Sequence, residues 1–283
     1  MIDETVAEIE AMQTHSSSVV AVKAAEALRE LTRREFPTVE DYRRTLAQNS
    51  RALRRANRSH ASLYTTQVDI VEHVEDADPE DVSTAKGLTV EAIERVVTAV
   101  EEGKERAASR AADFLADDGV LFTHDFSSTV LSAVETAVDD GATFEVYVSE
   151  SRPRYLGRKM ARKLAAHDGV DVTLAVDAAS GHYLAACDRV VVGMDCIVED
   201  TLYNRVGTYP LATAADHQDV PMTVVGAHSK FVDGGFAFEN DFRSPSEVLR
   251  EPTDEFTVGN PAYDATPTAL LDTVVTDREV RRY

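Results

Sequence analysis

The spacing of apolar side chains changes character partway along the chain. Up to residue 116, apolar residues recur every three or four positions, as in the run Val90, Ile93, Val97 and Val100, which is the repeat of a helix with one buried face. Helices are predicted over 19–36, 39–74 and 88–115, with a loop at 76–79. The first follows Ser16–Ser18, whose residue type favours a helix N-terminus, and Pro37 ends it.

From residue 117 onward, short apolar runs rich in valine alternate with helical segments. Strands are predicted over 120–123, 144–148, 170–176, 189–192 and 222–225, and helices over 127–138, 156–167 and 207–216. This alternation is typical of a parallel, doubly wound sheet. The predicted fold class is therefore α/β, with an N-terminal helical domain over 1–116 and a Rossmann-like C-terminal domain over 117–283.

Composition and charge narrow the class of protein. Hydrophobic residues make up 43% of the chain, which is enough for a packed core. The chain has 50 carboxylates against 29 Lys and Arg, a formal net charge of −21, which disfavours a general nucleic-acid binder. This excess of acid, with few Lys and no Trp, indicates a cytoplasmic protein from a high-salt organism; the alternative is an ordinary acidic protein of a GC-rich genome.

Several kinds of site are excluded by missing motifs. The two cysteines, Cys187 and Cys196, predict neither a disulfide framework nor a metal site, and we expect both to pack in the interior. No glycine-rich dinucleotide or P-loop motif follows a strand, so no cofactor is expected. No apolar run is long enough for a membrane helix, and the acidic N-terminus lacks the apolar region of a signal peptide.

Polar side chains follow each predicted strand of the second half. The segments concerned are Thr123–Asp125, Ser149–Pro153, Asp177–Tyr183, Gly193–Asp195 with Tyr203–Thr208, and Gly226–Lys230. Ligands of such sheets bind beyond the carboxyl ends of the strands. Carboxylates, Arg, Asn, Lys and His gathered there suit an anionic small molecule handled by acid–base groups.

These segments carry a resemblance to a known family. Glu150–Pro153, Gly193–Asp195, Asn204–Thr208 and Asn260–Pro267, and more loosely Thr14–Ser18, resemble the motifs of the alpha, beta and delta subunits of translation initiation factor 2B. The same superfamily contains ribose-1,5-bisphosphate isomerase and methylthioribose-1-phosphate isomerase. The resemblance implies a helical domain followed by a Rossmann-like domain, a homodimer or higher oligomer, and initiation factor 2 as a possible partner.

The resemblance also implies roles for single residues. Asp195 matches an Asp that helps to move protons in the isomerases, although it could instead cap a helix or form an ion pair. Arg152 matches an Arg that faces phosphate, or it pairs with Glu150. Arg205 stands where the isomerases have Lys after the Asn that Asn204 matches. A phosphorylated small molecule is expected to bind between the domains, at Ser16, Ser17, Arg152, Asn204, Arg205 and Lys230. The free N–H groups of a helix start favour such an anion.

Two positions depart from the isomerase pattern. Asp125 stands where the isomerases place a catalytic Cys, and Leu156 stands where they have Gln. A carboxylate can still accept a proton, but the role of a thiol is lost.

Three functions follow from the sequence. The first is a regulatory protein, similar to an initiation factor 2B subunit, that binds a sugar phosphate or nucleotide without catalysis. The second is a sugar-phosphate aldose–ketose isomerase that uses Asp125 and Asp195 as its acid–base pair. The third is a structural subunit with a vestigial pocket. A dimer is expected through the C-terminal domain, because Phe231, Phe236, Phe238 and Phe242 crowd one short segment.

Overall fold

The computed structural model describes residues 2–10, 17–116, 119–232, 236–251 and 253–283. The chain forms two compact units: residues 1–103 with 229–239, and residues 104–228 with 240–283. The sequence places the change of domain at 116/117, whereas the division by contacts falls between Gly103 and Lys104, inside one long helix. The reason is that the last turns of this helix, with Ala108, Ala112 and Leu115, pack into the core of the second unit.

The first unit is helical. Its elements are α1 (Ile2–Glu10), α2 (Ser17–Thr32), α3 (Val39–Ala56), α4 (Ala61–Asp76), the first turns of α5 (Val82–Leu115), and the short strand β8 (Phe231–Val232). Thr38 caps α3, because its hydroxyl accepts a hydrogen bond from the N–H of Asp41. The predicted helix over 39–74 is wrong as one helix: it is interrupted after Ala56, where the Asn57 carboxamide accepts the N–H of Ser59.

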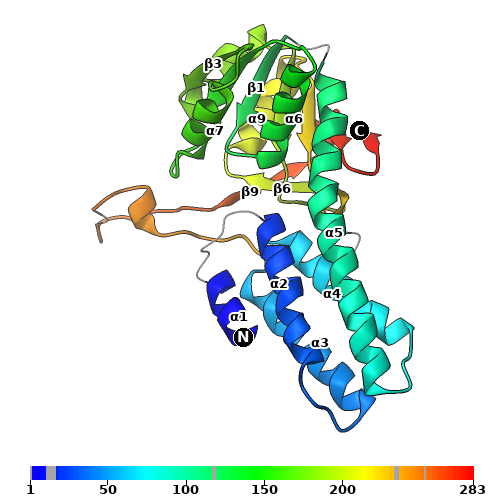
Figure 1. The fold of residues 1–283 in the computed structure, drawn as a ribbon. Coiled ribbons are helices and arrows are strands. Elements are labelled where there is room, and N and C mark those ends of the chain that lie inside the picture. Colours follow the sequence, from blue (N-terminus) through cyan, green and yellow to red (C-terminus); the bar gives the residue numbers. More distant parts are fainter. Residues whose placement is uncertain (1, 11–16, 117–118, 233–235, 252) are drawn as a thin grey trace. The chain divides into compact units, whose positions relative to one another are not determined.

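The second unit contains a seven-stranded sheet in the order β11-β10-β7-β4-β1-β2-β3 (Figure 1). Its strands are β1 (Val120–His124), β2 (Phe144–Ser149), β3 (Val170–Ala175), β4 (Arg189–Gly193), β7 (Met222–Val225), β10 (Thr273–Val275) and β11 (Val280–Arg282). All neighbouring pairs are parallel except β10 and β11. The five parallel strands predicted from the sequence are confirmed, and the α/β fold class with them.

The helices cover both faces of this sheet. They are α6 (Ser128–Asp139), α7 (Leu156–Leu164), α8 (Ser180–Tyr183) and α9 (Thr208–His217). The crossovers through α6 and α7 run from β1 toward β3, whereas those through α8 and α9 run the other way. Right-handed crossovers in opposite directions place these two pairs of helices on opposite faces. The core between α5, α6, α7 and the sheet includes the fully buried Leu115, Leu121, Val130, Val148 and Met160.

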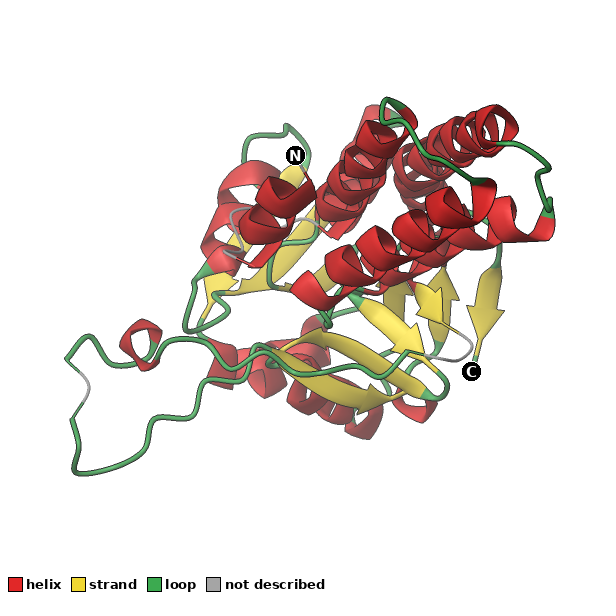
Figure 2. Ribbon diagram, turned by 90° about the horizontal axis from the view of Figure 1, so that it is seen from below, coloured by secondary structure: helices red, strands yellow, loops and turns green. Residues whose placement is uncertain are grey.

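A smaller antiparallel sheet was not predicted. It joins β5 (Cys196–Val198), β6 (Thr201–Arg205) and β9 (Tyr263–Pro267), and pairs Asn204 with Asp264. Before β9, residues 240–251 and 253–262 have little regular structure and belong to a long loop (Figures 1 and 2). Phe242 in this loop is 71% exposed, whereas Phe236 belongs to the first unit and packs against Tyr64.

Candidate functional site

The order of the strands fixes where a ligand site is expected. The chain winds from β1 through β2 to β3, and then returns to the other side of β1 with β4, β7 and β10. The direction therefore reverses between β1 and β4, and ligands of open parallel sheets bind in the crevice at such a reversal. Asp125 directly follows β1, and Asp195 follows β4 by two residues. Both predicted acid–base residues thus lie at the switch point of the sheet.

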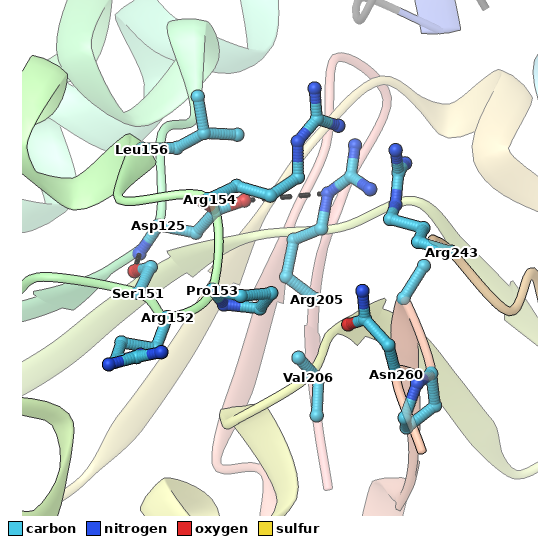
Figure 3. Close-up of a pocket in the computed structure, with 12 residues that line it drawn as sticks. Asp125, Ser151, Arg152, Pro153, Arg154, Leu156, Arg205, Val206, Arg243 and Asn260 are labelled. Carbon is cyan, nitrogen blue, oxygen red and sulfur yellow. Dashed lines mark hydrogen bonds and ion pairs between the residues drawn. The ribbon is translucent and has the colours of Figure 1, made fainter. Parts of the chain in front are cut away.

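One guanidinium group joins these two carboxylates. Arg205, the last residue of β6, has its Nε 3.4 Å from Oδ2 of Asp125 and 3.8 Å from Oδ2 of Asp195. The contact between Arg205 and Asp125 is drawn as a dashed line in Figure 3. The three side chains are 16%, 10% and 13% exposed. Two negative charges and one positive charge are therefore held together in a place that water reaches poorly.

Burial shifts the protonation of this cluster. Loss of solvent raises the pKa of Asp125 above its ordinary value, and Asp195 raises it further, whereas Arg205 and His124 oppose the rise. Burial alone would lower the pKa of Arg205, but Asp195, Tyr263 and Asp125 outweigh it, so that pKa lies above its ordinary value. The guanidinium group therefore keeps its charge, while Asp125 is a carboxyl group that holds its proton more readily than a carboxyl in water.

Hydrogen bonds fix the backbone that carries Asp125. Its φ is 63°, a left-handed conformation that costs energy for a residue with a side chain, and its N–H donates to Oγ of Ser151 at 2.7 Å. The N–H groups of Ser151 and Arg152 donate in turn to the two carboxylate oxygens of Asp177, each at 2.7 Å. The ends of β1, β2 and β3 are thereby tied together, which orients the Asp125 carboxyl group.

His124 has a structural role beside this cluster. Its Nδ1 lies 2.6 Å from Oγ of Ser149, and its Nε2 lies 2.9 Å from the carbonyl oxygen of Val206. Both ring nitrogens are thus engaged within the protein. Gly207 passes so close that a Cβ on it would lie 2.6 Å from the imidazole Cε1, and its φ is +107°. The imidazole therefore positions the turn between β6 and α9.

Two arginines that sequence reasoning missed lie in the same pocket. Arg154 and Arg243 line it with Asp125 and Arg205, and Figure 3 shows the three guanidinium groups gathered on one side. Burial and the nearby Arg243 lower the pKa of Arg154. The enclosed volume is about 30 Å³, room for one or two water molecules. Arg154 could have been found, since it continues the motif at Pro153, whereas no motif marks Arg243 in the long loop.

The other predicted ligand residues are placed differently. Asn204 alternates with Arg205 along β6 and donates from Nδ2 to Oγ1 of Thr208 at 3.1 Å, so its amide joins β6 to α9. Arg152 lines the pocket, but its Nη2 donates to the carbonyl oxygen of Val248 at 3.2 Å and its guanidinium group points away from the other three (Figure 3). The alternative pairing of Arg152 with Glu150 is wrong, since Glu150 binds Arg158 at 2.6 Å.

Three predicted ligand residues, Ser16, Ser17 and Lys230, are not among the described residues that line the pocket of Asp125. Ser17 is buried at the start of α2, and Lys230 ends a short 3-10 helix; both are part of the first unit. Ser16 lies outside the described residues. The predicted binding of a phosphorylated ligand by Ser16, Ser17 and Lys230 stays a prediction.

Neither thiol is suited to acid–base chemistry, although Cys196 directly follows Asp195 in the chain. Cys196 is completely buried in β5, and burial, followed by Asp188 and Glu145, raises the pKa of Cys187 to about 12. Leu156 begins α7 and lines the pocket where the isomerases have Gln. Among the described residues, no cluster of three or more His, Cys, Asp or Glu could hold a metal ion. In the same part of the chain, no helix combines the length and apolar character needed to span a bilayer.

Comparison with known proteins agrees with this architecture. The model of the initiation factor 2 subunit family matches residues 13–280. The chain is 30% identical to ribose 1,5-bisphosphate isomerase of Haloferax volcanii, covering 98% of this chain and 87% of that protein. It is 36% identical to methylthioribose-1-phosphate isomerase of Pseudomonas entomophila, over 57% of this chain and 48% of that protein.

A solved structure shows the same fold over the whole chain. The translation initiation factor eIF-2B of Pyrococcus horikoshii superimposes with a TM-score of 0.80 at 25% identity, covering 99% of this chain and 96% of that one. A family match over nearly all residues, together with relatives of similar length, leads to one conclusion: the chain belongs to the initiation factor 2 subunit family.

Proposed function

We propose that this protein is a sugar-phosphate aldose–ketose isomerase, with ribose 1,5-bisphosphate as its first candidate substrate. The observation that carries the proposal is the buried cluster in which Arg205 contacts both Asp125 and Asp195. The relatives in Haloferax volcanii and Haloterrigena turkmenica, 30% and 31% identical over 98% and 96% of this chain, bear the name ribose 1,5-bisphosphate isomerase. Their similarity supports this substrate over other phosphates.

The two carboxyl groups suit the chemistry of isomerisation. An aldose becomes a ketose when one carbon loses a proton and its neighbour gains one, so the composition of the sugar does not change. Asp125, whose pKa is raised by burial, supplies a proton to the ring oxygen as its bond to C1 breaks, and takes a proton back from the C2 hydroxyl as that group becomes the ketone. Asp195 removes the proton from carbon and returns one to the neighbouring carbon. Arg205 stabilises the negative charge that develops between these steps.

The arginines suit the phosphate groups. Guanidinium groups bind phosphate oxygens in pairs, and Arg154 and Arg243 lie beside the acid–base cluster with side chains 23% and 11% exposed. Because the enclosed volume holds only waters, the sugar phosphate lies in the open mouth of the pocket and displaces them. Arg154 and Arg243 then hold one phosphate group and fix the register of the sugar carbons.

A regulatory binding protein is the second candidate. It is favoured by Asp125 at the position of the catalytic Cys and by Leu156 at the position of Gln, because both changes remove groups that the isomerases use. A positively charged pocket would still bind a sugar phosphate or nucleotide in such a protein. Turnover separates the two functions, since the second predicts binding without product.

The test is turnover of ribose 1,5-bisphosphate by four purified proteins. Wild type is compared with Asp125→Asn, Asp195→Asn and the control Glu135→Gln, which removes a carboxylate that contacts His167 away from the pocket. We expect the two Asp variants to lose about 10² to 10⁴ in rate, and the control to keep wild-type activity. Binding of the substrate to an inactive wild type would support the regulatory function instead.

We also propose that the protein forms a homodimer or a higher oligomer. A solved relative of the same fold is a tetrameric complex of eIF2B beta and delta subunits from C. thermophilum. The long loop exposes Phe242 and Phe256, at 71% and 57%, which supports burial against a second chain. Light scattering of wild type and Phe242→Asp tests this: a dimer that becomes a monomer supports the proposal, and a monomeric wild type refutes it. Binding to initiation factor 2 is a separate expectation, tested by pull-down.

A further inference from the structure

A second group of arginines lies in the first unit, on one face of α3. Arg51, Arg54, Arg55 and Arg58 line a cavity of about 340 Å³ together with Tyr64, Phe236 and Ala237. Their spacing of three, one and three residues places the first three on one side of the helix, and Arg58 follows just after its end. All seven lining residues belong to the first unit.

Most of this positive charge is not neutralised within the described part of the chain. Arg58 pairs with Glu239 at 2.5 Å. Among the described residues, neither Arg51 nor Arg55 contacts a carboxylate, and Arg54 has a buried Nε without a hydrogen-bond partner. The guanidinium group of Arg54 lies over the ring of Tyr64 at 5.2 Å, and Tyr64 packs on Phe236 at the same distance. The aromatic rings therefore hold Arg54 at the cavity.

This arrangement is unusual for the chain. The protein carries a net charge of −21, and other arginines of the helical unit have acidic neighbours, such as Arg29 with Glu26, and Arg43 with Asp78. Like charges three and four residues apart on a helix repel each other. A cluster that persists among so many available carboxylates is explained if an anion completes it.

We propose that this cavity binds a chain of two or more phosphate groups. Arginine forks bind phosphate oxygens in pairs, and several forks around one cavity match an anion with several charges better than a single carboxylate. The volume lies in the range of small-ligand sites. Inorganic pyrophosphate and the diphosphate of a nucleotide share this chemistry. The site lies in the helical unit and uses neither Asp125 nor Asp195, so it does not rest on the proposed isomerase activity.

Calorimetric titration with inorganic pyrophosphate tests the proposal. It is done without divalent cations, at the lowest KCl concentration at which a melting curve still shows folded protein, because salt screens such contacts. The variant is Arg51→Gln with Arg55→Gln. The matched control is Arg33→Gln with Arg34→Gln, which removes two exposed charges from the turn just after α2. We expect the first pair to weaken binding at least about tenfold and the control to weaken it less than about twofold.

Two further arms separate the alternatives. The double variant Arg154→Gln with Arg243→Gln removes the phosphate contacts of the Asp125 pocket, so any pyrophosphate that still binds is held elsewhere. Adding Arg51→Gln with Arg55→Gln must weaken this remaining binding, whereas loss of all pyrophosphate binding in the first double variant assigns the ligand to the Asp125 pocket and overturns the proposal. Adenosine diphosphate replaces pyrophosphate in the second arm, and tighter binding that depends on Arg51 and Arg55 identifies a nucleotide as the source. Absence of binding to wild type at millimolar pyrophosphate, or equal weakening in the variant and the α2 control, also overturns it. Circular dichroism melts show that each variant is folded.

Discussion

Arg205 is the residue on which the candidate site depends most, and Arg205→Gln tests this. The change removes the positive charge 3.4 Å from Asp125 and 3.8 Å from Asp195, and its contact with the ring of Tyr263 at 4.9 Å. Removing one partner of a buried ion pair costs about 3–5 kcal/mol, because the other charge stays buried. We therefore expect the free energy of unfolding to fall by about this amount at pH 7.

The loss of stability in Arg205→Gln should depend on pH. Without Arg205, the strongest opposition to the raised pKa of Asp125 disappears, so the folded state holds its proton to a higher pH than before. Between the unfolded and folded pKa values, the folded state then binds more protons than the unfolded chain, and stability falls as pH rises. The cost of Arg205→Gln is thus small below the unfolded pKa of Asp, and it grows as pH rises through the folded pKa.

Urea unfolding followed by circular dichroism measures this at several pH values. Arg158→Gln is the control, because Arg158 also pairs with a carboxylate and lies over a ring, but is 43% exposed; its loss should be about 0–1 kcal/mol. Adding Asp125→Asn to Arg205→Gln should restore part of the stability at high pH. If Arg205→Gln lowers the free energy of unfolding no more than the control does, or by the same amount at every pH, the buried ion-pair cluster of Arg205 with Asp125 and Asp195 is refuted.

Three further predictions concern other parts of the chain. Gly157→Ala should lower the free energy of unfolding by at least about 3 kcal/mol, because the added Cβ would lie 1.8 Å from the carbonyl oxygen of Ser149. Gly87→Ala has free space in α5 and should raise it by about 0.5–1 kcal/mol in the same urea assay. In the folded protein, both cysteines should react with iodoacetamide at pH 8 at least about 100-fold more slowly than in urea. The reason is that Cys187 has a pKa of about 12 and Cys196 is fully buried. Labelling in the folded protein as fast as in urea, measured by mass spectrometry, would contradict this. Raising KCl from 0.1 M to 2 M should raise the melting temperature, because salt screens the net charge of −21; an unchanged or lower value would count against a high-salt origin.

The sequence predicts those elements whose signal is local. β1, β4 and β7 are buried along nearly their whole length because both faces of the large sheet are covered, and their short, mostly apolar runs identify them in the sequence. β6 and β9 were missed because each has only five residues, of which only two are buried, so neither contains a run of apolar residues. The break between α3 and α4 contains neither Pro nor Gly, so the sequence offers no strong signal for it.

The candidate site was predictable to the extent that strand ends define it. Asp125 and Asp195 were found because parallel strands bring their carboxyl ends to one edge, and Arg205 because it belongs to a motif. Arg243 was not found, since a long loop carries it. Backbone bonds bring the loop back to the pocket, among them those from the N–H of Arg243 to the carbonyl oxygen of Asn260 at 2.9 Å and from the N–H of Ala262 to the carbonyl oxygen of Asp241 at 2.8 Å. The different directions of Asn204 and Arg205 follow from strand alternation, which was invisible while β6 was unrecognised.

The most direct test of the central claim is a ³¹P NMR time course of ribose 1,5-bisphosphate with wild type and Asp195→Asn. A phosphate on the C1 of an aldose ring and one on the C1 of a ketose give distinct signals, so substrate and product are followed in one tube. The proposed mechanism predicts conversion by wild type and a rate lower by about 10² to 10⁴ in the variant. A spectrum that stays unchanged with folded wild type, or conversion by Asp195→Asn at the wild-type rate, would contradict it.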